Sequence, residues 1–252
     1  SGFWFWPIVG ASVTLALVTV GLIWFFSTLT DKGTTAGSIV TREQLTQQIQ
    51  QGRDILLKQH SFRVAADHLG IASQWMEQQP GLLSPAETLQ ARQWHRQAVL
   101  FSRLLRKESL EEILKEARRQ IRDDEWRALF RENYQGGAVL FDDQLVENDQ
   151  GQIELQWYSA QIGKVKARIE IPLKVLTKVD LGQPRRVIFG ARLHSIQRGE
   201  GGVWIIRFDP DSGVLITEPE LLRFVSGQPL DDETLRQVSE QRRWLNLSKE
   251  QP

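Results

Sequence analysis

The chain has 252 residues, of which 41% are hydrophobic and 25% are charged, an ordinary composition for a globular protein. Its 31 basic and 31 acidic residues balance, so the overall charge gives no indication of nucleic-acid binding. It contains no cysteine, which excludes disulfides, thiolate metal sites and cysteine nucleophiles.

The stretch 3–29 contains no charged residue. About 20 apolar residues suffice to cross a hydrocarbon core, and this stretch is longer. Trp4 and Trp6 near one end and Trp24 near the other stand where interfacial aromatic residues stand in membrane proteins. We therefore predict a single-pass transmembrane anchor within residues 1–30, surrounded by membrane lipid, rather than a buried core helix or a cleaved signal peptide.

Residues 31–40 are rich in glycine, serine and threonine, which predicts a short flexible linker. Lys32 and Arg42 are the only basic residues in the first dozen positions after the anchor. Because positively charged flanks stay on the cytoplasmic side, this sparse charge favours an extracytoplasmic, periplasmic location for the soluble part.

Residues 41–134 show the hydrophobic periodicity of amphipathic helices. Capping boxes predict three helix starts, at Thr41 with Gln44, Ser84 with Glu87, and Ser109 with Glu112. We expect helices over 42–60, 62–78 and 85–105 and a fourth after 109, which either continues through 126–130 or is followed there by a short fifth. The third helix is expected to bury a stripe that begins at Leu89 and includes Trp94.

The first two helices alternate small and large residues in the way that packed helical hairpins do. These residues are Gly52, Leu56, Phe62, Ala65, Ala66, Leu69, Ala72 and Pro80. The pattern covers about 40 residues and resembles tetratricopeptide-type hairpins, although the Trp-x-x-Leu-Gly opening is missing and the next hairpin does not repeat it. The resemblance implies a helical-hairpin bundle whose use is to hold another protein.

From residue 135 to residue 217 the hydrophobic period is two, which predicts short β-strands. The clearest strand spans 164–171, where apolar residues alternate with charged ones, as in an antiparallel strand with one face in water. Further strands are expected over 138–142, 153–158, 185–196, 203–208 and 214–216. Such a set makes a small antiparallel β barrel or sandwich, for which an oligonucleotide/oligosaccharide-binding-like barrel is one option.

Residues 218–252 should form C-terminal helices and a tail. Thr217 and Glu220 have the spacing of a capping box, and Asp231 or Asp232 should cap the last helix. The predicted fold class is α+β: a single transmembrane helix, an antiparallel helical-hairpin bundle, a small antiparallel β barrel or sandwich, and C-terminal helices.

No group of residues has the spacing of a known catalytic or metal site. The four histidines, His60, His68, His95 and His194, lack the pairing with glutamate that a helical zinc site needs. The paired carboxylates occupy positions typical of turns and helix starts: Asp123 and Asp124, Asp142 and Asp143, Asp209 and Asp211, Asp231 and Asp232. We therefore expect no enzyme, no cofactor and no metal.

Basic residues gather in the β region. Between 164 and 198 nine lysines and arginines stand against two acidic residues, whereas 209–252 has nine acidic residues against five basic ones. The candidate binding face consists of Lys164, Lys166, Arg168, Arg185, Arg186 and Arg192. Such a face could hold an anionic ligand, or its charges could be neutralised by the acidic C-terminal part. Few aromatic residues are interleaved, which disfavours nucleic acid.

The main functional hypothesis is a membrane-anchored accessory subunit that scaffolds or stabilises a membrane complex by binding other membrane-protein subunits. The alternative is a membrane-tethered module whose basic sheet face holds a glycan, a lipid headgroup or an acidic partner. An enzyme with a site assembled from distant residues would require a deep pocket carrying His194 or paired carboxylates.

Overall fold

The computed structural model describes residues 40–105, 110–120, 122–158, 167–179 and 183–247. Thr41 and the residues after it form one compact unit. The predicted anchor with its three tryptophans, the linker before residue 40, and Lys164 and Lys166 lie outside the described ranges. Within these ranges no helix is both long and apolar enough to cross a membrane.

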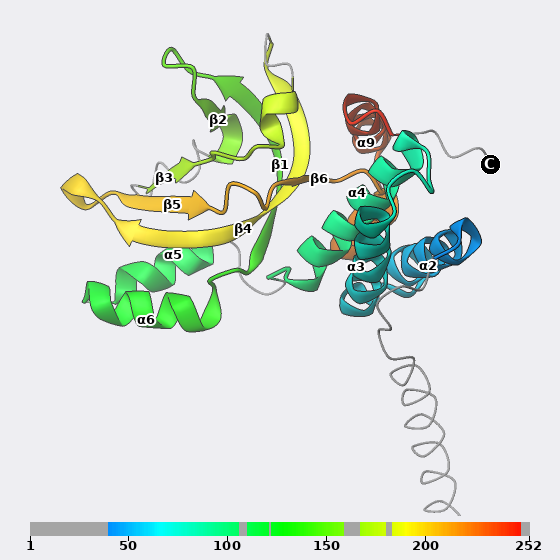
Figure 1. Cartoon of the computed structure of the whole chain (residues 1–252). Helices are drawn as coiled ribbons and strands as arrows, with labels where there is room; N and C mark the ends of the chain where they lie inside the picture. Colours follow the sequence, from blue (N-terminus) through cyan, green and yellow to red (C-terminus); the bar gives the residue numbers. More distant parts are fainter. Residues whose placement is uncertain (1–39, 106–109, 121, 159–166, 180–182, 248–252) are drawn as a thin grey trace, which may run out of the picture. The chain divides into compact units, whose positions relative to one another are not determined.

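The described residues begin with three helices: α2 (Arg42–Asp54), α3 (Phe62–Gln78) and α4 (Pro85–Ser102) (Figure 1). α2 and α4 each pack on α3. The predicted capping boxes at Thr41 and Ser84 are both present, with each hydroxyl accepting from a backbone N–H three residues later. These helix starts are confirmed, whereas Ser109 lies outside the described residues.

The first helix changes geometry before its predicted end at residue 60. α2 ends at Asp54, and a π-helical turn, η1 (Ile55–Gln59), leads to His60, whose φ of 52° is left-handed. The wider turn places the neighbouring residues Ile55 and Leu56 both in the core. The predicted helix to residue 60 therefore differs from the structure in its last turn, which is π-helical and ends at the left-handed His60.

The described part of the chain holds one curved, nearly closed, barrel-like sheet (Figure 1). Its strands are β1 (Ala138–Glu147), β2 (Ile153–Leu155), β3 (Ala167–Glu170), β4 (Arg185–Arg198), β5 (Trp204–Phe208) and β6 (Val214–Leu215). The strand order is β2-β1-β4-β5-β3, and β6 pairs with β4. β1 and β4 form a long antiparallel ladder from Ala138 opposite Arg192 to Leu145 opposite Arg185. Two short 3-10 turns, η2 (Leu176–Lys178) and η3 (Glu200–Gly202), lie in the connections.

One strand pair differs from the antiparallel prediction. β3 pairs with β5 in parallel, with Ala167 opposite Trp204 and Glu170 opposite Arg207. The chain passes through β4 between these two strands, so no hairpin sets their relative direction. The alternating pattern identifies a half-exposed strand but not its direction, and the purely antiparallel prediction is wrong for this pair.

β2 is shorter than the strand predicted over 153–158. It ends at Leu155, and the next three residues form a helical turn. The carboxylate of Asp143, which is fully buried, accepts the N–H of Trp157 at 2.9 Å and the N–H of Tyr158 at 2.8 Å. These bonds to a side chain of β1 take the place of the backbone ladder and hold the helical turn beside β1.

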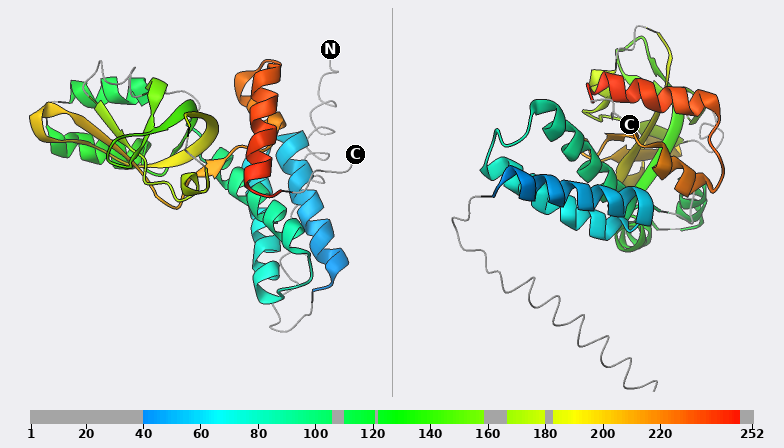
Figure 2. Two further views of the ribbon diagram at one scale, coloured as in Figure 1. Left: turned by 90° about the horizontal axis from the view of Figure 1, so that it is seen from above. Right: turned by 90° about the vertical axis from the view of Figure 1, so that its right-hand side faces the viewer.

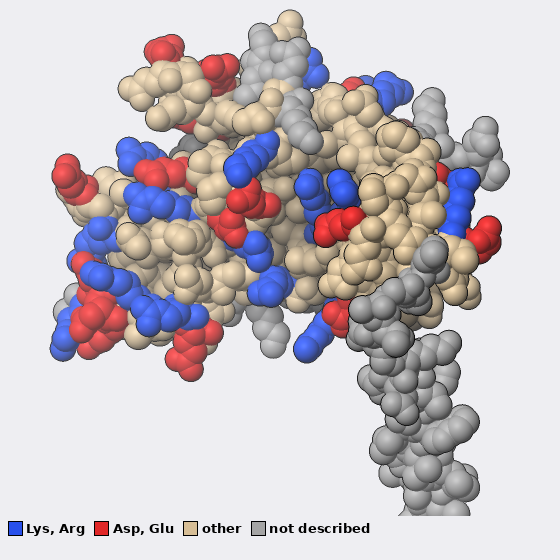
Figure 3. All heavy atoms as spheres, in the orientation of Figure 1, with Lys and Arg blue, Asp and Glu red and all other residues tan. Residues whose placement is uncertain are grey.

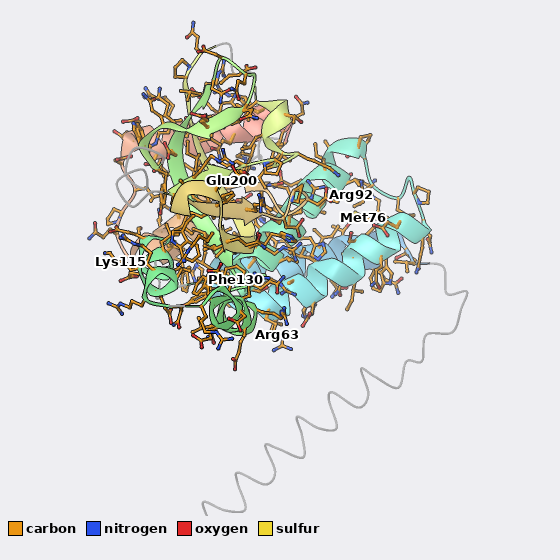
Figure 4. The ribbon with its side chains drawn as sticks, turned by 90° about the vertical axis from the view of Figure 1, so that its left-hand side faces the viewer. Arg63, Met76, Arg92, Lys115, Phe130 and Glu200 are labelled. Carbon is orange, nitrogen blue, oxygen red and sulfur yellow. The ribbon has the colours of Figure 1, made fainter. Side chains whose placement is uncertain are left out.

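Two short helices, α5 (Leu110–Arg119) and α6 (Asp123–Asn133), cover one side of the sheet (Figure 1). Their buried residues share one hydrophobic core with the strands. Trp126 lies edge-to-face against Trp204, and its indole N–H donates to the carbonyl of Ile196 at 2.7 Å. The helices that the sequence groups with the hairpins thus pack on the sheet, as Figure 4 shows for Phe130.

The C-terminal helices are α8 (Pro219–Ser226) and α9 (Asp232–Trp244), at the junction of the first three helices and the sheet (Figure 2). Asp231 caps α9 by accepting the N–H of Thr234, as predicted. The predicted capping box at Thr217 is wrong, because α8 begins after Glu218 without a side-chain cap. The Thr217 hydroxyl instead accepts from Gln97 of α4.

Candidate functional site

The basic residues singled out in the sequence lie at separate places on the sheet. Arg185 and Arg192 are seven positions apart on β4, at opposite ends of its ladder with β1, and Arg168 is on β3. Figure 3 shows acidic side chains interspersed among the basic ones over the sheet.

Arg186 is more enclosed than Arg168 or Arg192. Its Nε and Nη2 donate to the two carboxylate oxygens of Asp142 at 2.7 and 2.6 Å, and its Nη1 lies 3.2 Å from Glu233 of α9. The hydrogen bond to Asp142 raises the pKa of Arg186 above its ordinary value. This arginine ties β1 to α9 and is not available to a ligand without breaking those bonds.

The other described arginines of the face also have partners. Arg168 lies 2.8 Å from Glu170, and Arg192 lies 2.7 Å from Asp209. The guanidinium of Arg185 lies 5.7 Å from the ring centre of Trp244. An anionic ligand would compete with these contacts. These contacts favour the second interpretation, in which the basic charges are neutralised within the fold. The neutralising residues belong to the sheet and its turns as well as to the C-terminal part.

An apolar groove of about 200 Å³ lies between α2 and α4. Both helices pack on α3, and they meet one another through side chains such as Arg42 of α2 and Glu87 of α4, 3.2 Å apart. Its apolar lining is Ile49 of α2, Leu83 of the α3–α4 loop and Trp94 of α4, and exposed polar residues such as Thr46 border it. A dry cavity of about 150 Å³ accommodates benzene, so this groove has room for one large apolar side chain.

Gln90 adds an unused hydrogen-bond acceptor to the groove. It lines the groove and is 7% exposed, and its Nε2 donates to Glu218 at 3.4 Å. Its Oε1 has no donor among the described residues. The oxygen is covered, so a ligand reaches it only when the amide turns toward the groove. A buried carbonyl without a donor costs about 1–3 kcal/mol, which favours a ligand that brings an N–H or O–H group.

Neighbouring contacts hold the wall of the groove in place. The indole N–H of Trp94 donates to Glu218 at 2.9 Å, and Glu218 is itself 2% exposed and lies 3.5 Å from Arg242 of α9. The guanidinium of Arg53 lies 5.1 Å from the ring centre of Trp94. The indole is thus oriented before any partner arrives, which reduces the entropy lost on binding.

Buried glutamines of α4 join this helix to the segment after β5. Gln93 donates to the carbonyl of Leu215 at 2.6 Å, and Gln97 accepts the N–H of Thr217 at 2.9 Å. Sequence reasoning missed these residues, and it placed Leu89 on the buried stripe although Leu89 is 37% exposed. The available signal was the spacing of three glutamines at 90, 93 and 97, which puts them on one helix face with Trp94.

The histidines do not come together. His60 stacks on Phe224 with ring centroids 4.6 Å apart, and His68 lies on α3 beside Gln48. Burial, with the charge of Arg96 as a smaller cause, lowers the pKa of His95. His194 is exposed on β4. Among the residues that the structure describes, no three His, Asp or Glu side chains are grouped so as to hold a metal ion.

The paired carboxylates serve the fold where they are described. Asp143 accepts backbone N–H groups, and Asp142 pairs with Arg186. In the loop 209–213, Asp211 lies 2.7 Å from Lys174.

Comparisons with known proteins find no match to a protein-family model, to a curated protein or to a solved structure. Function is therefore inferred from the geometry of this chain.

Proposed function

We propose that the chain is a single-pass membrane-anchored accessory subunit that holds a partner protein in the groove between α2 and α4. The observation that carries the proposal is an apolar groove beside a buried amide oxygen that no described donor satisfies. Protein interfaces concentrate their binding energy in a few large side chains seated in such pockets. The uncharged stretch 3–29 supports the anchor.

The groove is large enough to contribute measurably to affinity. Burying one leucine, isoleucine or phenylalanine side chain is worth about 1.5–3 kcal/mol. A donor to Gln90 would add about 1 kcal/mol. Since 1.4 kcal/mol corresponds to a tenfold change in Kd, closing the groove should weaken binding by about tenfold or more.

The alternative, an anionic ligand on the basic sheet face, has less support. Arg168, Arg186 and Arg192 each lie within ion-pair distance of a carboxylate. A ligand would gain only the difference between its own contacts and these existing ones.

A matched pair of substitutions tests the proposal. Thr46 and Gln47 are neighbouring exposed residues of α2, but only Thr46 lines the groove. The partner is first recovered with the full chain from detergent-solubilised membranes, and its affinity is then measured for wild type, Thr46→Trp and Gln47→Trp. We expect Thr46→Trp to weaken binding about tenfold or more and Gln47→Trp to leave it unchanged.

Two results would contradict this function. One is the absence of any stoichiometric partner in the detergent extract. The other is equal binding by the two tryptophan variants, which would place the interface elsewhere. The anchor is tested separately, since recovery of the intact chain in the aqueous fraction of lysed cells would refute it.

A further inference from the structure

A small cavity of about 210 Å³ lies between α4 and the turn that precedes β6. Its apolar lining is Val99 and Leu100 of α4 and Val214 of β6, and Arg96 of α4 also lines it. We call it the junction cavity. We propose that the junction cavity binds a small aliphatic monocarboxylate, with the carboxylate at Arg96 and the hydrocarbon chain against the apolar lining.

The charges around the junction cavity leave one cation without a partner. Arg192, which lines the cavity, lies 2.7 Å from Asp209. Asp211, which also lines it, lies 2.7 Å from Lys174. Arg96 forms no ion pair with any residue that the structure describes. The positive charge of Arg96 therefore stands beside apolar walls without an opposing charge, which favours an anionic ligand at this place.

His95, the residue before Arg96, is a second group that responds to an anion. It is half-buried and lines the junction cavity. Burial lowers the pKa of His95, and the charge of Arg96 lowers it further, whereas Glu77 of α3 acts in the opposite direction as the smallest cause. A carboxylate bound at Arg96 would offset that positive charge, so its binding should raise the pKa of His95.

The wall of the cavity opposite α4 is ordered before any ligand arrives. Ser212 is buried, donates its hydroxyl to the carbonyl of Asp209 at 2.7 Å and accepts the N–H of Arg192 at 2.9 Å. The N–H of Lys174 donates to the carbonyl of Pro210 at 3.1 Å. Because these bonds hold the turn in place, little entropy is lost when a ligand binds against it.

The size of the junction cavity limits the length of the ligand. A dry cavity of about 150 Å³ accommodates benzene, so this one has room for a chain of about four to six carbon atoms. A single guanidinium can bind a carboxylate through two parallel hydrogen bonds. One carboxylate therefore matches the one unpaired cation that lines the cavity among the described residues.

The test follows the NMR signals of isotope-labelled histidine in the full chain, kept in a non-ionic detergent. The chain has four histidines, of which only His95 lines the junction cavity. Sodium hexanoate is titrated at several pH values, and we expect a saturable shift of the His95 ring signals, with a Kd of about 1 mM, and a raised pKa of His95. Hexanol has the chain without the charge, and acetate has the charge without the chain. Each should bind at least about tenfold more weakly than hexanoate.

Two arginines of α4 provide a matched pair of variants. Arg92, labelled in Figure 4, and Arg96 are exposed, lie one turn apart, and form no ion pair with a described residue. Only Arg96 lines the junction cavity. We expect Arg96→Gln to weaken hexanoate binding about tenfold and Arg92→Gln to leave it unchanged.

Three results would overturn the proposal. They are the absence of a saturable shift of the His95 signals, binding of hexanol or acetate as tight as that of hexanoate, and equal affinities of the two arginine variants. Thr46→Trp leaves the junction cavity unaltered, so it should bind hexanoate as wild type does. The carboxylate site and the partner groove between α2 and α4 can therefore fail independently.

Discussion

Replacing Gln241 by leucine should destabilise the junction between α9 and the sheet. Gln241 is fully buried on α9. Its Oε1 accepts the N–H of Ile188 at 2.6 Å, and its Nε2 donates to the carbonyl of Ile216 at 2.6 Å. The side-chain amide thus bridges the N–H of Ile188 on β4 and the carbonyl of Ile216 after β6. Leucine is similar in size but has no polar atom.

The cost follows from which groups lose a partner. The carbonyl of Ile188, which also accepts from Gln241 at 2.9 Å, keeps the N–H of Ile216 as a donor. The N–H of Ile188 and the carbonyl of Ile216 lose their bonds to the amide. At about 1–3 kcal/mol for each of these two buried unsatisfied groups, Gln241→Leu should lower the free energy of unfolding by roughly 2–6 kcal/mol.

Urea unfolding of the full chain measures this loss. Gln237→Leu is the matched control, since Gln237 lies one turn earlier on α9 and its amide contacts Gln241 at 3.4 Å. It should cost under about 1 kcal/mol, because it leaves no backbone group unpaired. A Gln241→Leu variant as stable as wild type, or two variants with equal losses, would refute the reasoning.

Three further predictions concern other parts of the fold. Burial and, second, the charge of Asp143 raise the pKa of Tyr158, so Asp143→Asn should lower that pKa in an ultraviolet titration. The lowered pKa of His95 means that the unfolded chain binds its proton more tightly. Stability should therefore fall as the pH drops below about 6.5, and His95→Gln should flatten that fall in unfolding measured from pH 8 to pH 5.5. A Cβ on Gly52 would lie 2.7 Å from the Leu69 side chain of the facing helix. Gly52→Ala should therefore lower the free energy of unfolding, measured with urea, by about 1–3 kcal/mol. Gly70→Ala is the control and should cost less, because the nearest atom to its Cβ would be 3.5 Å away.

Each of these has a contradicting result. An unchanged tyrosine titration would show that Asp143 is not charged beside Tyr158. A pH profile that His95→Gln leaves unaltered would assign the acid sensitivity to other groups. Equal costs for the two glycine substitutions would mean that the close approach at Gly52 relaxes without loss.

Features that depend on local chemistry could be predicted from the sequence. The helix starts at Thr41, Ser84 and Asp231 are correct because each cap joins a side chain to a backbone group three residues away. The strand predicted over 185–196 is confirmed as β4, since buried apolar residues such as Val187, Phe189 and Ile196 recur along it.

Features that depend on partners distant in the sequence could not be predicted. Thr217 has the spacing of a cap, but Gln97, 120 residues earlier, binds its hydroxyl and its N–H instead. The groove between α2 and α4 could not be predicted from the sequence for the same reason. Gln90 and Trp94 look like ordinary helix residues until Glu218, more than 120 positions away, fixes their orientation.

Glu218 also gives the molecule a mechanical link. One carboxylate holds the indole of Trp94 through Oε1 and faces Arg242 through Oε2. Any shift of this indole would therefore also disturb the contact between Glu218 and Arg242 of α9, the helix that packs on β4. The wall of the groove and the far side of the sheet are in this way joined through one buried carboxylate.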